Sequence, residues 1–183
     1  LTKLQGSPKP DPSEYTYTHI SGTFYGGATL TILGPEEIDM NVVGDYMIDD
    51  YFFTGGDNYQ LQMTAGYVHV VAQNDERVIF IDIHDMDKVY NGYKQTHDTG
   101  YTEQWNSQPA GYTLDNSQAI YTYYDAGFDI GVEGVKDVGS YTTIVSNLIV
   151  RDINNNDVTN QFVFITTQGD ITIQQKALTI END

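Results

Sequence analysis

Residues 162–174 (FVFITTQGDITIQ) decide the fold class, because apolar and polar side chains alternate along them on both sides of Gly169. Alternation with a period of two is typical of a β-strand with one buried face. Residues 59–71 (YQLQMTAGYVHVV) align with this stretch without a gap, so that Gly66 matches Gly169. Each stretch is therefore predicted to form a strand, a glycine-containing turn and a second strand.

The same order of motifs surrounds both stretches. An apolar run follows each one, at 78–83 (VIFIDI) and 177–180 (ALTI). A similar motif precedes each one, 24–27 (FYGG) in the first half and 89–92 (VYNG) in the second. Internal similarity in a fixed order indicates repeated structural units. The sequence therefore predicts an all-β chain of two tandem small modules with little helix, at residues 14–86 and 87–183.

Two segments depart from the alternating pattern. Residues 1–13 (LTKLQGSPKPDPS) hold three of the five prolines and are predicted to be a linker or leader. Residues 35–41 (PEEIDMN) begin with proline and two acids, which favours a helical turn or a short helix. Alternation alone leaves two arrangements open for each module, an immunoglobulin-like sandwich and a β-grasp-like sheet.

Composition excludes several classes of partner. The net charge is −18, with only 8 Lys plus Arg. Nucleic acid would be repelled, because binding to it requires cations that face phosphates. No apolar run is long enough to cross a membrane as a helix, so we expect no membrane insertion. The chain has no cysteine, which excludes disulfides and thiol catalysis.

Four motifs of the second half occur in a familiar order. They are KVYNG (88–92), KDVGSY (136–141), DINNNDVTN (152–160) and KALTI (176–180). This order resembles the MBG/YDG-type repeats of large bacterial cell-surface adhesins, which carry K-x-Y-D-G, D-V-G-x-Y, D-V-T-x-N-Y and K-A-L-T-I. Asn91 replaces the usual aspartate of the first motif, and Gln161-Phe162 replaces the usual Asn-Tyr. The resemblance covers most of 87–183, and residues 14–86 resemble a shorter, divergent relative of the same module.

The resemblance implies a non-catalytic repeat of a bacterial cell-surface adhesin. Such a repeat acts in adhesion to host or matrix glycans or proteins, or as a stalk spacer. It implies an extracellular location at the cell surface, in a Gram-positive cell wall, with neighbouring repeats of the same chain as partners. No set of catalytic roles can be filled from the sequence, so we expect no enzyme activity.

Aromatic residues are the candidate ligand contacts. Trp105 is the single tryptophan, and Tyr121, Tyr123 and Tyr124 crowd together in IYTYYD. Exposed aromatic faces stack on sugar rings and anchor interfaces. The alternative function is therefore a carbohydrate-binding module of a secreted glycan-degrading enzyme. The competing structural interpretation is that these rings fill a small core.

Oxygen-bearing side chains are the candidate metal ligands. Asp152, Asn154, Asn156 and Asp157 alternate in the way that calcium loops do, but they lack the glycine and the distant glutamate of a helix-loop-helix site. A plain turn is the competing interpretation. A second acidic group is Asp45, Asp49 and Asp50. The four histidines lack the spacing of a zinc site. We therefore expect no cofactor and no metal, with calcium as the alternative that the oxygen ligands leave open.

Overall fold

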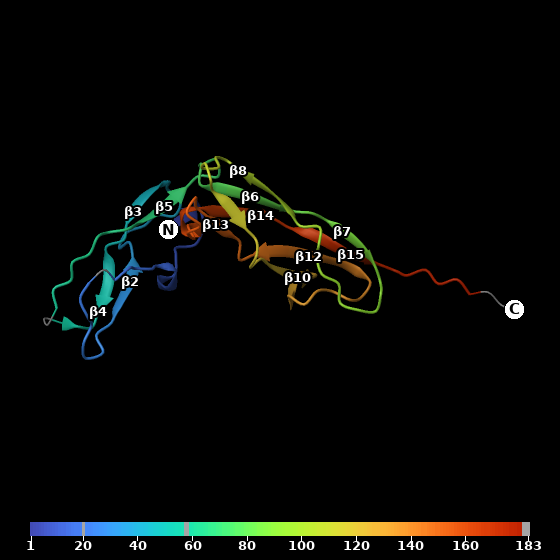
Figure 1. Ribbon diagram of the computed structural model, residues 1–183, viewed down its shortest axis with the longest axis horizontal. Helices are drawn as coiled ribbons and strands as arrows, with labels where there is room; N and C mark the ends of the chain where they lie inside the picture. The colour runs from blue at the N-terminus through green and yellow to red at the C-terminus, as the bar shows by residue number, and fades with distance from the viewer. Residues whose placement is uncertain (20, 57–58, 181–183) are drawn as a thin grey trace. The chain divides into compact units, whose positions relative to one another are not determined.

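The computed structural model describes residues 1–19, 21–56 and 59–180. Strands dominate this part of the chain, and it contains no α-helix (Figure 1), which confirms the predicted all-β class. Two short 3-10 helices are fully described, η1 (Pro12–Glu14) and η3 (Thr159–Gln161). No helix in the described residues has the length and apolar character needed to span a membrane.

The chain forms two compact units. Unit 1 comprises Leu1–Arg77 and Asn160–Val163, and unit 2 comprises Val78–Thr159 and the residues from Phe164 onward. The first boundary between the units therefore follows Arg77, whereas the sequence predicted a boundary after residue 86. Residues 181–183, which the prediction assigned to the second module, lie outside the described residues.

Unit 1 contains two small sheets. One has the order β1-β5-β3, and the other pairs β2 with β4. The pairing of β1 with β5 is parallel, whereas β3–β5 and β2–β4 are antiparallel. The strands are β1 (Thr2–Leu4), β2 (Leu30–Gly34), β3 (Gly44–Met47), β4 (Asp50–Phe53) and β5 (Tyr67–Val71).

The core of unit 1 forms around β5. Val68 and Val70 are fully buried, because alternate side chains of a strand point to the same face. They pack in one cluster with Tyr15, Ile32 and Met40. This cluster connects the two sheets of the unit with the segments between their strands.

Unit 2 contains three sheets. Their strand orders are β11-β10-β12-β15-β7, β14-β6-β8 and β13-β9. The strands are β6 (Val78–Ile83), β7 (Met86–Val89), β8 (Tyr101–Trp105), β9 (Thr113–Asp115), β10 (Ile120–Asp125), β11 (Phe128–Gly131), β12 (Gly139–Ser146), β13 (Ile149–Arg151), β14 (Val163–Thr167) and β15 (Gly169–Gln174).

Alternation correctly predicted the buried face of β15. On β15, Ile171 and Ile173 are buried while their polar neighbours face outward. On β6, Ile79 and Ile81 are buried and Asp82 is exposed. Burial of a large aliphatic side chain contributes about 1.5–3 kcal/mol, so these two strands supply much of the free energy that stabilises the unit.

One register relates two long segments of unit 2. β7 and β15 are parallel and lie side by side in Figure 1, with Ile171 opposite Met86. Upstream of this pair, the Asp170 N–H donates to Asp85 Oδ1 at 2.8 Å, again 85 positions apart. The hydroxyl of Thr167, on β14, is bonded to Asp82, also 85 positions away on the neighbouring strand β6. The two segments therefore stay in one register while they pass from one sheet into the next.

The predicted linker at 1–13 is wrong. Its first residues form β1, which pairs with β5, and Thr2 is buried. Its end forms η1, capped by Asp11, whose carboxylate accepts the Ser13 N–H at 2.9 Å. Proline at a first-turn position suits such a helix start. The prolines therefore shape a tightly held segment of unit 1.

The predicted hairpins are wrong as well. Only Tyr67–Val71 of the first stretch is a strand, since 59–66 has no strand assignment. In the second stretch β14 and β15 exist, but they belong to different sheets. A Cβ built on Gly169 would lie 2.7 Å from the carbonyl oxygen of Ile83, so this glycine permits a close backbone approach instead of a turn. Residues 177–180 form no strand.

No helix forms at 35–41, contrary to the prediction. The Glu36 N–H donates to Asp49 Oδ1 at 2.9 Å, and the Asn41 N–H donates to Asp39 Oδ1 at 2.9 Å. Aspartate side chains that accept nearby backbone N–H groups compete with helical hydrogen bonds. Met40 meanwhile is buried in the core of unit 1.

Candidate functional site

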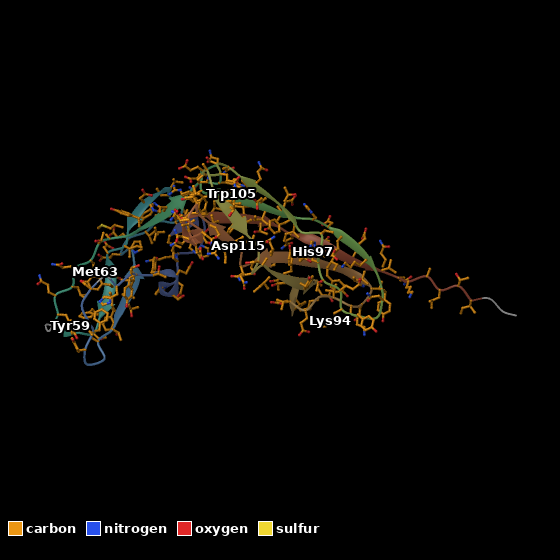
Figure 2. The ribbon with its side chains drawn as sticks, in the orientation of Figure 1. Tyr59, Met63, Lys94, His97, Trp105 and Asp115 are labelled. Carbon is orange, nitrogen blue, oxygen red and sulfur yellow. The ribbon has the colours of Figure 1, made fainter. Side chains whose placement is uncertain are left out.

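A pocket of about 760 Å³ lies at one end of the β2–β4 sheet of unit 1. We call it the FYGG pocket, because three residues of the FYGG motif contribute to it. Its lining residues are Tyr25, Gly26, Gly27, Ala28, Thr54, Gly55 and Tyr59. Tyr59 is labelled in Figure 2.

The β2–β4 ladder brings the two halves of the pocket together. Leu30 pairs with Phe53, and beyond this pair the Thr54 N–H donates to the Thr29 carbonyl at 3.0 Å. The Thr29 N–H donates in turn to the Thr54 hydroxyl at 2.6 Å. These bonds hold residues 24–28 opposite residues 54–55.

The two glycines of the motif make the turn. Gly26 and Gly27 have φ angles of +64° and +77°. These values lie in the left-handed region, which residues with a Cβ enter at a cost. The Ala28 N–H donates to the Tyr25 carbonyl at 3.2 Å and closes the turn. The backbone is thus folded back in a way that leaves the Tyr25 ring 72% exposed.

Tyr59 fastens this turn from a distant part of the sequence. Its hydroxyl accepts a hydrogen bond from the Tyr25 N–H and donates one to the Tyr25 carbonyl at 3.1 Å. Both bonds use backbone atoms of Tyr25, so the position of the turn does not depend on the Tyr25 ring. That ring is free to contact a ligand.

Aromatic rings next to the pocket pack against one another. The Phe53 and Tyr59 rings meet edge to face, with centroids 5.4 Å apart. The Phe24 ring lies 5.8 Å from that of Phe53, and His19 stacks on Phe24 at 5.3 Å. Pairs of this kind contribute roughly 0.5–1.5 kcal/mol beyond their buried area. A Cβ on Gly55 would lie 2.2 Å from the Phe53 ring, so the cluster requires glycine there.

The described lining of the pocket is aromatic and uncharged. Among its described lining residues there is no Asp, Glu, Lys, Arg or His side chain, although the chain carries 26 acids. It offers the rings of Tyr25 and Tyr59, a threonine hydroxyl and backbone polar groups. This set can stack on an apolar ligand face and exchange hydrogen bonds.

The predicted tyrosine cluster is largely a packing element. Tyr123 is 1% exposed and belongs to the core of unit 2, and Tyr121 packs against the same core. Burial raises the pKa of both hydroxyls. Tyr124 lies on the opposite face of β10 and is half-buried. The structure thus does not gather the three rings on one exposed face.

Trp105 belongs to a different sheet from the tyrosines. It is labelled in Figure 2 and is the last residue of β8, opposite Ile79 of β6. The tyrosines lie on β10. The ring is half-buried, and its Nε1–H donates to Glu103 Oε1 at 3.3 Å. The acid beside it gives this indole a polar partner within its own strand.

The predicted calcium loop is a turn held by its own side chains. Asp152 Oδ1 accepts the N–H groups of Asn154 and Asn156, each at 2.8 Å, and Asp152 Oδ2 accepts the Asn156 side-chain amide at 2.9 Å. Hydrogen bonds from Asn156 lower the pKa of Asp152, and those from Thr159 lower the pKa of Asp157. Across the described residues, no three His, Cys, Asp or Glu side chains are grouped to hold a metal ion.

The second acidic group is divided among separate contacts. Asp45 bonds His69 Nδ1 at 2.6 Å, and Asp49 accepts the Glu36 N–H. Asp50 opens β4 and is exposed. Because Asp45 and Asp49 each have a different partner, the three carboxylates are not gathered around one point by the contacts of the structure.

Sequence reasoning missed the FYGG pocket although it singled out the motif itself. The glycine pair predicts a turn, but Tyr59 joins that turn from 34 positions away. The sequence feature that could have indicated the pocket is an aromatic residue before two glycines, together with a second group of aromatic residues and glycines at residues 51–56.

No protein-family model, curated protein or solved structure that was compared with this chain matches it. The resemblance to adhesin repeats therefore depends on the four sequence motifs.

Proposed function

We propose that this chain is a non-catalytic part of a bacterial cell-surface adhesin and that unit 1 binds neutral glycans through the FYGG pocket. The location outside the cell and the adhesive role come from the motif order in residues 88–180. The choice of ligand class comes from the pocket, because its chemistry is that of sugar recognition.

The observation that supports this proposal most directly is a pocket whose described lining is aromatic and uncharged, in a strongly acidic chain. Sugar rings present an apolar face that stacks on an aromatic ring, and hydroxyls that need donors and acceptors. Tyr25 offers the exposed ring, and Thr54 with the backbone of Gly26 and Gly27 offers polar groups. The net charge of −18 repels sulfated or sialylated ligands, which favours a neutral glycan.

A carbohydrate-binding module of a secreted enzyme would use the same pocket. The two candidates differ in context, since a module of that kind assists an attached catalytic domain, whereas an adhesin repeat holds a cell to a surface. The four motifs shared with adhesin repeats favour adhesion.

The test is binding of the purified chain to an array of neutral and acidic glycans and to mucin. We expect binding to neutral glycans that Tyr25→Ala abolishes, because this substitution removes the exposed ring and keeps the backbone bonds to Tyr59. The matched control is Tyr93→Ala in unit 2, where the ring is 77% exposed and remote in sequence from the pocket. Binding that survives Tyr25→Ala, or that Tyr93→Ala removes equally, would overturn the assignment of the pocket.

A further inference from the structure

Each unit contains a parallel pair of strands, β1–β5 in unit 1 and β7–β15 in unit 2. If the chain is pulled at its two ends, the force reaches each unit through segments that belong to or adjoin these pairs. In unit 1 the chain starts in β1 and passes from β5 toward Arg77. The chain first enters unit 2 through β6, returns to unit 1 over Asn160–Val163, and finally leaves unit 2 after β15. A force that pulls on the two ends of the chain is therefore transmitted through the hydrogen bonds between these paired segments.

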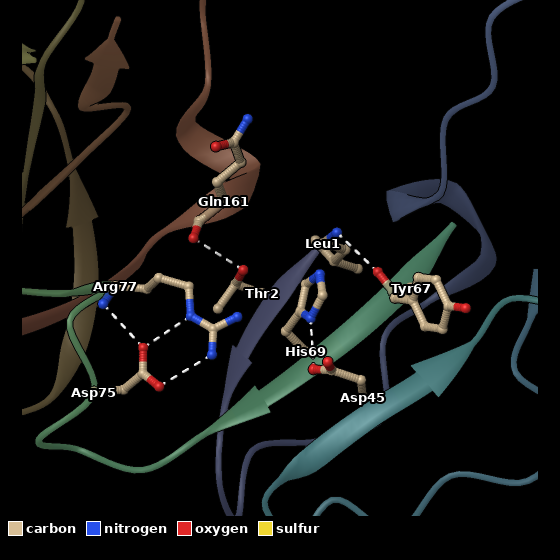
Figure 3. Close-up of polar contacts among 8 residues, drawn as sticks. All are labelled: Leu1, Thr2, Asp45, Tyr67, His69, Asp75, Arg77 and Gln161. Carbon is tan, nitrogen blue, oxygen red and sulfur yellow. Dashed lines mark hydrogen bonds and ion pairs between the residues drawn. The ribbon is translucent and has the colours of Figure 1, made fainter. Parts of the chain in front are cut away.

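The contact in unit 1 involves the whole length of β1. Thr2, Lys3 and Leu4 pair with His69, Val70 and Val71. The ladder extends at both ends. The Leu1 amino group donates to the Tyr67 carbonyl at 3.1 Å (Figure 3), and the Gln5 N–H donates to the Val71 carbonyl at 2.8 Å.

Further contacts join β1 and the residues next to it to parts of unit 1 other than β5. The Thr2 hydroxyl donates to the Gln161 carbonyl at 2.9 Å, as Figure 3 shows. Lys3 forms an ion pair with Glu14, and the Gly6 N–H donates to the Met40 carbonyl at 2.7 Å. Leu1 packs against the core of unit 1. Slippage of β1 along β5 would break several of these contacts at once.

The contact in unit 2 is longer. Residues 86–89 pair with residues 171–174, and the Tyr90 N–H donates to the Gln174 carbonyl at 2.9 Å. The Asp85–Asp170 bond and the Thr167–Asp82 bond continue the same register of 85 positions toward β6 and β14. β15 is also paired with β12 on its other side, so it cannot move alone.

Whether two strands are parallel or antiparallel decides how the hydrogen bonds between them are loaded by a pulling force. In a parallel pair the start of one strand lies opposite the start of the other. Tension that pulls the first strand toward its N-terminus and the second toward its C-terminus therefore slides them past each other. Sliding loads all bonds of the ladder together, whereas pulling apart two ends on the same side breaks the bonds one after another.

We propose that both units are load-bearing, with β1–β5 and the β6–β7/β14–β15 ladder as two mechanical clamps in series. Segments between the clamped strands, 5–66 and 90–162, are shielded from tension until a clamp fails. The shielded segments include the FYGG pocket, which keeps its shape while the chain is under load. The inference rests on topology and does not require that the pocket binds a glycan.

The test is single-molecule pulling with handles attached through introduced cysteines, which are unique because the chain has none. With handles beyond the two ends, we expect two ruptures. Leu1 and Tyr67 are 66 positions apart, so failure of the first clamp releases about 220 Å of chain. Asp85 and Asp170 are 85 positions apart, so failure of the second releases about 290 Å.

The control changes only the direction of the force on the second clamp. Handles at Glu76→Cys and Gln175→Cys load it by sliding, and handles at Tyr93→Cys and Gln175→Cys peel it from one end. All three positions are exposed, so the substitutions leave the core intact. We expect a higher rupture force in the sliding geometry at equal loading rate. Equal forces in the two geometries, or released lengths that do not fit the two separations, would overturn the proposal.

Discussion

The hydroxyl of Tyr123 accepts a hydrogen bond from the backbone N–H of His97 at 2.7 Å, and both residues are buried in unit 2. The His97 ring stacks on Tyr121, with centroids 5.3 Å apart and planes inclined by 16°. His97 Nε2 lies 2.5 Å from the His84 carbonyl, which can only accept, so this nitrogen carries the proton. The tyrosines thus fasten the segment after β7 onto the five-stranded sheet.

Removal of the Tyr123 hydroxyl tests this role. In Tyr123→Phe the buried His97 N–H loses its acceptor, which costs about 1–3 kcal/mol for an unsatisfied buried group. We expect a matching decrease in the free energy of unfolding, measured by urea denaturation. Tyr124→Phe is the control, since that ring lies on the opposite face of β10 and is half-buried. A decrease of the same size in the control would show that the hydroxyl of Tyr123 has no special role.

The close approach at Gly169 predicts a second stability effect. In Gly169→Ala the new Cβ would lie 2.7 Å from both Ile83 Cγ2 and the Ile83 carbonyl, and the backbone of β6 cannot yield easily. Overpacking of this kind costs about 1–3 kcal/mol. Gly139→Ala on β12 is the matched control, because its nearest contact would be an ordinary 3.5 Å to Tyr141. Thermal unfolding of the two variants should differ clearly, and similar midpoints would contradict the close approach.

The Asp75–Arg77 pair predicts a pH-dependent contribution to stability. Arg77 Nε and Nη2 donate to the two carboxylate oxygens at 2.8 and 3.0 Å, and this pairing lowers the pKa of Asp75 below its ordinary 3.8. A lowered folded-state pKa stabilises the fold above pH 3.8, and this contribution is lost as the pH falls through the folded-state value.

We therefore expect Asp75→Asn to be less stable than the parent at pH 7 and to approach it as the pH falls below 3.8. Urea unfolding of both proteins over this range measures the difference. Arg77→Gln should show the same trend, because it removes the cation. A difference that stays constant with pH would indicate that the charge of Asp75 contributes nothing.

The 152–157 turn predicts how calcium affects the protein. Because the Asp152 carboxylate already binds the N–H groups of Asn154 and Asn156, we expect Asp152→Ala to lower the melting temperature equally in calcium and in EDTA. Thermal unfolding in the two buffers checks this. A parent protein that melts higher in calcium, with the increase abolished in Asp152→Ala, would show instead that the loop holds a cation.

The sequence by itself determined which strand faces are buried. Ile171 and Ile173 alternate with polar residues in the sequence, and both are buried. This succeeded because the period of a strand is local and needs no knowledge of partners. The all-β class followed for the same reason, and the glycine pair at 26–27 made a turn because only glycine adopts a positive φ there at low cost.

Only the tertiary structure decided which segments pair. Residues 162–174 look like a hairpin, yet their two strands join different sheets and lie along residues about 85 positions away. The FYGG pocket likewise depends on Tyr59, which meets Tyr25 across 34 positions. Alternation indicates which face of a strand is buried, but it does not indicate which strand lies beside it. The neighbouring strand is decided by the packing of the whole chain, in which a close backbone approach at Gly169 takes the place of the expected turn.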